Sequence, residues 1–277
     1  MSDHYSETQP TSLHEVIRGL GGDLAEGEAV WRFEQLARLV REGADPNEED
    51  AHDMTPLAIL MDEHVIINSQ VGVIAQDMVA TLIQAGANPL IKDRAIGKSD
   101  RSQLGMVMVE EIIFAAEKGR LVQAEDGGNL LHVLAEDDLN LLGWVLNRKE
   151  SARAADSFNL PAVWLSECRQ SDGATPAHAL LSEDSIIVSY VENDMDADEY
   201  FDPAWNCLRL FIALGVDLKT KNADGMTIAN FIADKVGEGT LPVEDEETWA
   251  VIESFSTHET LQKKTRKAPG KGRQSRF

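Results

Sequence analysis

The sequence has little cysteine, and its two cysteines, Cys168 and Cys207, lie far apart. Two such residues form neither a disulfide framework nor a four-cysteine zinc site, which favours a reducing compartment. No stretch approaches the roughly 18 consecutive apolar residues of a membrane helix. The polar N-terminus, MSDHYSETQP, lacks the charged-then-apolar order of a signal peptide. We therefore expect a cytoplasmic protein without a membrane partner, unless a specialised secretion system exports it.

Basic residues are scarce in the body of the chain. The formal net charge is -23, and seven of the 25 basic residues lie after residue 262. The body of the chain therefore has 18 basic and 48 acidic residues, which gives it a net charge of about -30. Residues 182–202 alone carry eight carboxylates and no Lys or Arg. Such an excess keeps a protein soluble, and it also suits a partner with a basic surface, so both interpretations stay open.

Motifs for catalysis and for cofactors are also missing. The glycines at 19–22 lack the Lys-Ser/Thr of a phosphate-binding loop and follow a helix rather than a strand. The alternating aspartates at 194–198 resemble the start of a calcium loop, but Glu199 and Trp205 occupy the positions that need Gly and Glu. We therefore expect no enzyme, no cofactor and no metal. An enzyme with its site in the insertions described below is the alternative.

One short phrase recurs five times along the chain. Thr or Asn at its start is suited to cap a helix N-terminus, and Pro56 and Pro176 suit the first helical position. The phrase therefore predicts the start of a first helix in each repeat. Its copies are TSLHEVI at 11–17, TPLAILM at 55–61, NLLHVLA at 129–135, TPAHALL at 175–181 and TIANFIA at 227–233.

A second phrase alternates with the first. It consists of the end of a segment whose apolar residues have helical spacing and of the glycine that follows this segment. Gly43, Gly86 and Gly215 stand where each helix must stop, because glycine readily adopts the left-handed conformation there. The repeated unit is therefore a first helix, a second helix, a glycine stop and a turn.

The two phrases together, T-P-x-H followed by L-[LI]-x-x-G-A-[DN]-x and D-G-x-T, resemble the ankyrin repeat, whose period is about 33 residues. The chain is similar to a divergent, bacterial-type member with insertions, because its openings lie 44 to 74 residues apart. The resemblance implies an all-α, ankyrin-like solenoid of about five to six helix-pair repeats with enlarged loops. It also implies a structural role for His14, His132 and His178, which bond backbone between neighbouring repeats.

The resemblance covers roughly residues 9–255, and we expect residues 9–258 to form the repeat domain. Residues 1–8 are predicted to be a flexible N-terminus and 259–277 a basic disordered tail, since the tail is rich in Lys, Gly, Pro and Ser. Residues 93–126 contain a helical pattern that is either a decayed repeat or an extra helix. The tail is expected to shield the acidic insert or to contact nucleic acid weakly.

The expected function is a non-enzymatic protein-binding module, an adaptor, effector or inhibitor that recognises a protein partner with a basic surface. An acidic DNA mimic that inhibits a nucleic-acid-binding protein is the alternative, and direct nucleic-acid binding is expected only through the tail. The resemblance implies contacts through turns, inner helices and insertions, and Trp164 is predicted to be an aromatic anchor on a projecting loop. The predicted contact residues are Asp50, Asp53, Lys92, Arg94, Arg101, Trp164, Asp172, Asp224 and Met226.

Overall fold

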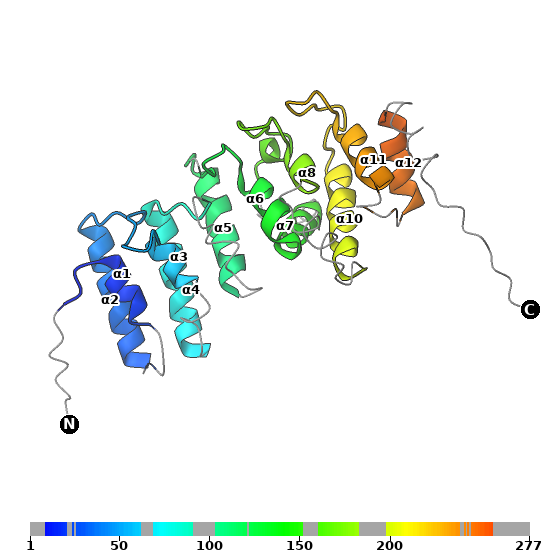
Figure 1. The fold of residues 1–277 in the computed structure, drawn as a ribbon. Coiled ribbons are helices and arrows are strands. Elements are labelled where there is room, and N and C mark those ends of the chain that lie inside the picture. The colour runs from blue at the N-terminus through cyan, green and yellow to red at the C-terminus, as the bar shows by residue number, and fades with distance from the viewer. Residues whose placement is uncertain are drawn as a thin grey trace, which may run out of the picture. The chain divides into compact units, whose positions relative to one another are not determined.

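The computed structural model describes residues 9–20, 24, 26–61, 69–90, 103–120, 122–151, 160–182, 198–238, 241, 243 and 245–256. Within these ranges the chain is helical, and its extended structure is limited to one isolated bridge between Lys221 and Thr227. The described residues group into two compact units, Met1–Glu125 and Asp126–Phe277 (Figure 1). Each unit is a set of packed helix pairs, so the predicted all-α class is confirmed.

In the described residues of unit 1, two helix pairs are followed by one further helix. The first helices are α1 (Leu13–Arg18) and α3 (Pro56–Leu60), which contact each other. The second helices are α2 (Glu26–Arg41), α4 (Ser69–Ala85) and α5 (Gln103–Glu117). Helix α4 packs between α2 and α5, so the second helices form a layer of their own (Figure 1).

Unit 2 repeats the same arrangement. Its first helices are α6 (Leu130–Asp137), α8 (Pro176–Ala179) and α11 (Ile228–Glu238), and α8 contacts both of the others. Its second helices are α7 (Leu139–Ser151), α10 (Asp198–Ala213) and α12 (Glu246–Phe255). Helix α7 packs on α10, α12 packs on α11, and the short 3-10 helix η2 (Ala162–Leu165) contacts α6 and α8.

The helix starts follow the capping chemistry that the repeated opening predicts. The Thr55 side chain accepts a hydrogen bond from the Ala58 amide at 3.2 Å, and the Asn129 side chain accepts one from Leu131 at 2.9 Å. The first copy starts one residue later than its alignment suggests, because Ser12, rather than Thr11, is the N-cap. Each cap satisfies an amide that has no partner within the helix, which contributes about 1 kcal/mol.

The helix stops are confirmed, and a fourth one emerges. Gly43, Gly86 and Gly215 have φ of 93°, 109° and 86°, and Gly119 after α5 has φ of 76°. Each is followed by an amide that donates back into the last helical turn, as Arg120 N does to Ala115 O at 3.0 Å. This cap, together with its packing on α4, makes α5 the second helix of a repeat rather than an extra helix.

The apolar faces of the helices bury each other within each unit. In unit 1, Leu36, Met78 and Ile112 of the second helices are fully buried. In unit 2, Leu142 of α7 and Trp205 of α10 are buried as well. Because each buried apolar side chain contributes roughly 1.5–3 kcal/mol, neighbouring repeats stabilise each other and isolated repeats lack a core.

Several sequence-based expectations concern residues outside the described ranges. These are the N-terminal residues 1–8, the basic tail 259–277, the insertion around 62–68 and most of the acidic insert at 183–197. Among the helices that the structure describes, none combines the length and the apolar character needed to cross a membrane.

Candidate functional site

Buried histidines tie α1 and α6 to the turn of the next repeat. His14 Nε2 lies 3.1 Å from Met54 O, and His132 Nε2 lies 2.9 Å from Ala174 O. In the second case Nδ1 accepts a hydrogen bond from the Asn129 amide, so Nε2 must carry the proton and donate. The structural role that the resemblance implies is therefore confirmed for both histidines.

His178 occupies the equivalent place in α8 and is buried. Its Nδ1 accepts a hydrogen bond from the Thr175 amide at 3.3 Å and lies 2.9 Å from Thr175 Oγ1. Burial lowers the pKa of His178 to about 4, although the Met226 carbonyl acts in the opposite direction. Burial also lowers the pKa of His132. Both rings are therefore neutral near pH 7.

The turns that precede α3 and α11 have the same hydrogen-bonding pattern. Asp50 N donates to Met54 O at 3.1 Å, and Asn222 N donates to Met226 O at 3.0 Å. In return, each Met amide donates to the side chain of Asp50 or Asn222 at 3.0 Å. Asp53, with φ of 58°, replaces the glycine found in the later turn, and a left-handed Asp is tolerated there.

Backbone and amide contacts join the turns within each unit. In unit 1, Asn47 Nδ2 donates to Gly86 O at 2.9 Å, and Asn88 Nδ2 donates to Gln123 O at 2.8 Å. In unit 2, Gln170 N donates to Asp126 O at 3.1 Å and Ala223 N donates to Asp172 O at 2.7 Å. We call each of these hydrogen-bonded rows of turns a turn edge. These hydrogen bonds hold the turns of each edge in position without a partner.

A buried arginine anchors the turn edge of unit 2. Arg169 is 8% exposed and pairs with Asp126 at 3.2 Å, with Asp172 at 2.6 Å and closely with Glu136. The hydrogen bonds from Arg169 lower the pKa of Asp172, and the carboxylates raise that of Arg169. Sequence reasoning missed this cluster, because its members come from three separate segments and no local motif connects them.

The predicted contact residues are placed differently by the structure. Asp53 and Asp224 are exposed at turn tips, while Asp172 and Met226 are partly exposed. The Asp50 side chain is only 7% exposed, because it bonds Arg18 and the amides of its own turn, and the Met54 amide contributes most to its lowered pKa. Lys92, Arg94 and Arg101 lie outside the described residues.

Trp164 requires a correction. It was predicted to project from a loop as an aromatic anchor, but it belongs to η2 and is only 8% exposed. Its carbonyl accepts a hydrogen bond from Asn129 Nδ2 at 3.1 Å. Because η2 packs on α6 and α8, the indole fills space between repeats and offers little surface to a partner.

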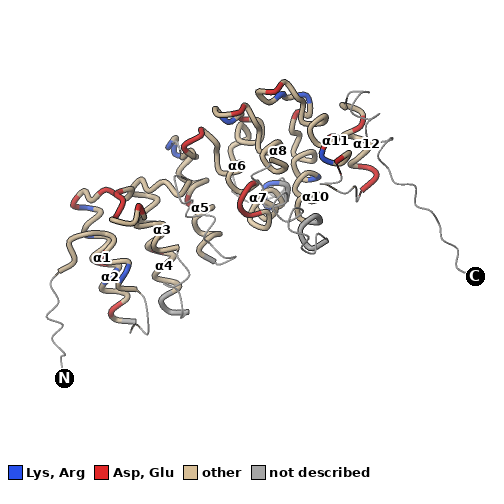
Figure 2. The backbone as a smooth tube through the Cα atoms, in the orientation of Figure 1, with Lys and Arg blue, Asp and Glu red and all other residues tan. Residues whose placement is uncertain are grey.

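Acidic residues are frequent along the first turn of unit 1 (Figure 2). We call this group the acidic turn, and its exposed carboxylates are Glu42, Asp45, Glu48, Glu49 and Asp53. The last turn of unit 2 is mixed in charge, since Lys219 and Lys221 accompany Asp217 and Asp224. The strongest negative field of a described turn is therefore expected at the acidic turn.

Among the described residues, no three His, Cys, Asp or Glu side chains are grouped so that they could hold a metal ion. The acidic turn agrees with this, because its carboxylates are spread along the chain and do not converge on one point. What the arrangement offers chemically is a preorganised, negatively charged surface.

No family model matches the sequence, and no characterised protein matches it. Among solved structures, the ankyrin repeat domain of Bcl-3, described as a unique member of the IkappaB protein family, is 17% identical with a TM-score of 0.46. That match covers 91% of this chain and 89% of the other. The Bd0816 predatory endopeptidase of Bdellovibrio bacteriovorus in complex with immunity protein Bd3460 is 18% identical, with a TM-score of 0.41 and coverage of 90% and 100%. The ankyrin-like repeat assignment rests on the helix pairs, caps and histidine connectors of the chain itself.

Proposed function

We propose that this protein is a non-enzymatic binding module that recognises a basic surface of a protein partner through its turn edges. The observation that carries the proposal is the acidic turn, held in place by hydrogen bonds to the neighbouring turn. A surface that is already ordered loses little conformational entropy on binding, so its contacts contribute more to affinity.

Charge gives the surface its selectivity. Five exposed carboxylates lie between residues 42 and 53, and Asp50 is internally paired with Arg18. A basic partner is attracted over about 8 Å at physiological ionic strength, which speeds the encounter more than it strengthens the final complex. A partner with an acidic surface is repelled by the same field.

The test compares two variants that lose the same amount of charge. E48Q/E49Q/D53N neutralises three exposed carboxylates of the acidic turn, and E110Q/E117Q/E253Q neutralises three exposed carboxylates on helices. Asn is tolerated at position 53 because it also adopts positive φ. Affinity capture from native lysate and mass spectrometry identify the partner, and stopped-flow mixing then gives its association rate.

We expect the turn variant to slow association roughly tenfold or more at low salt and to flatten its dependence on salt. The helix variant should change the rate far less, although its net charge is the same. Equal rates for the two variants would show that net charge alone, and not the turn edge, drives binding.

A further inference from the structure

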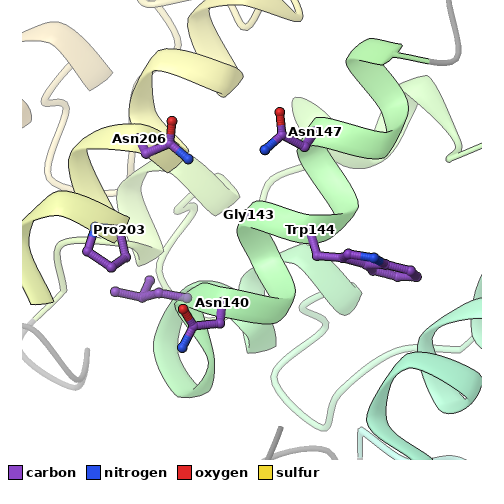
Figure 3. Close-up of a pocket in the computed structure, with 7 residues that line it drawn as sticks. Asn140, Gly143, Trp144, Asn147, Pro203 and Asn206 are labelled. Atoms are coloured by element: carbon purple, nitrogen blue, oxygen red, sulfur yellow. The ribbon is translucent and has the colours of Figure 1, made fainter. Parts of the chain in front are cut away.

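A groove lies between the second helices of unit 2, away from the turn edge. Its volume is about 410 Å³, and Asn140, Gly143, Trp144 and Asn147 of α7 line one side, with Pro203 and Asn206 of α10 on the other (Figure 3). The α10 residues lie near the middle of that helix, whereas the turn begins after Gly215. This groove is therefore distinct from the surface proposed above.

Three carboxamides dominate the groove. Asn140 and Asn147 are seven residues apart on α7, which places them on one face about 10.5 Å apart along the helix axis. Asn147 and Asn206 point toward each other across the groove (Figure 3). All three are exposed, and among the described residues their side chains form no hydrogen bond that competes with a ligand.

The chemistry of the lining selects an uncharged ligand with alternating donors and acceptors. No charged side chain is among the lining residues, so burial of a charged ligand would have no compensating partner. Each carboxamide offers one acceptor and two donors, which match the C=O and N–H groups of a peptide bond. An extended peptide rises about 3.3 Å per residue, so about three residues span the two asparagines of α7.

One further feature favours a linear peptide over a sugar. The Trp144 ring has the Arg148 guanidinium 5.0 Å from its centroid, which occupies one face that a sugar would stack on. Asn206 also lines a second concavity of about 290 Å³ between α10 and α12, where Arg209, Asp245 and Glu247 are charged, so the uncharged lining ends at Asn206.

Gly143 supports a role in ligand binding. It lies inside α7, where glycine is less favourable than alanine. Packing does not require it, since a Cβ at this position would meet only Cys207 Sγ, at an ordinary contact distance of 3.7 Å. Because glycine has no side chain, the backbone of a bound ligand can approach α7 closely at this position.

We propose that the groove binds an extended, uncharged peptide segment of a partner protein, and that Asn140, Asn147 and Asn206 form hydrogen bonds with the backbone of that peptide. This inference does not depend on the acidic turn, and it holds whether or not the turn edge binds a protein.

The test starts from a displayed library of random dodecapeptides, selected on the immobilised full-length chain and counter-selected on N147A/N206A. The enriched peptides are synthesised with capped ends, once unmodified and once with N-methylated backbone amides. We expect uncharged sequences whose affinity falls tenfold or more both with N147A/N206A and with N-methylation, because each change removes backbone hydrogen bonds. G143A should also weaken binding while raising the melting temperature.

Two controls separate this site from the turn edge and from misfolding. Q170A removes an exposed carboxamide at the turn edge, and it should leave peptide affinity unchanged, as should E48Q/E49Q/D53N. If N147A/N206A lowers the melting temperature, the single variant N206A decides the question. The proposal is overturned if no selected peptide depends on the asparagines or if N-methylated peptides bind equally well. It is also overturned if cellohexaose or maltohexaose, rather than a peptide, binds in an asparagine-dependent way.

Discussion

Acid should destabilise unit 2 through His178. The ring is 1% exposed, and its pKa falls from 6.5 to about 4 because burial disfavours the charged form. The unfolded chain binds this proton below pH 6.5, whereas the folded chain binds it only below about pH 4. Between these values the unfolded state holds more protons, so the free energy of unfolding falls as the pH falls.

The magnitude follows from the same two pKa values. The full difference corresponds to about 3 kcal/mol, and about 2.5 kcal/mol of it is lost between pH 7.5 and pH 4.5. This is a large fraction of the 5–15 kcal/mol that typically stabilises a domain. His132 adds to the loss in the same direction, since burial lowers its pKa as well. The lowered pKa of Asp172 matters only below this range.

Urea unfolding at half-unit steps from pH 4.5 to pH 7.5 measures the effect. H178Q cannot titrate, so its free energy of unfolding should be lower at neutral pH but about 2.5 kcal/mol less sensitive to acid than that of the unmodified chain. H52Q, which changes an exposed histidine in a turn, is the matched control and should keep the full pH dependence. If H178Q and the unmodified chain lose stability in parallel, His178 is not the group that titrates.

Three further substitutions test the scaffold by urea unfolding at pH 7. R169M should cost about 3–5 kcal/mol because it removes the guanidinium that pairs with the buried Glu136 carboxylate. E136Q/R169M should recover part of that loss, and additive effects of the two substitutions would contradict the coupling. G119A should cost at least about 1 kcal/mol, because the φ of Gly119 is 76° and alanine is strained there. G72A in α4 should be stabilising, because a Cβ at that position meets no atom within 4 Å. If both variants change the free energy of unfolding in the same direction, Gly119 does not act as a helix stop. T55A should cost about 1 kcal/mol by removing the cap of α3, and T81A, which shortens a partly exposed side chain within α4, should cost less.

The repeat architecture is largely a local property of the sequence. N-caps such as Thr55 and Asn129 and helix stops such as Gly86 act within a few residues, so the same phrase produces the same structure wherever it occurs. The alternation of the two phrases therefore identified first helices, second helices and turns. The acidic excess in the body of the chain was also readable, because charge is carried by the residues themselves.

Tertiary structure decided which side chains remain available to a partner. Trp164 reads as an exposed anchor on an irregular segment, but packing between α6 and α8 buries it. Arg169 joins Asp126 and Glu136 only after distant segments fold together, and Asn147 meets Asn206 across the groove for the same reason. Local patterns fix where a helix starts and stops, but contacts between residues far apart in the chain depend on how the helices pack, and that packing determines the surfaces this protein can use for binding.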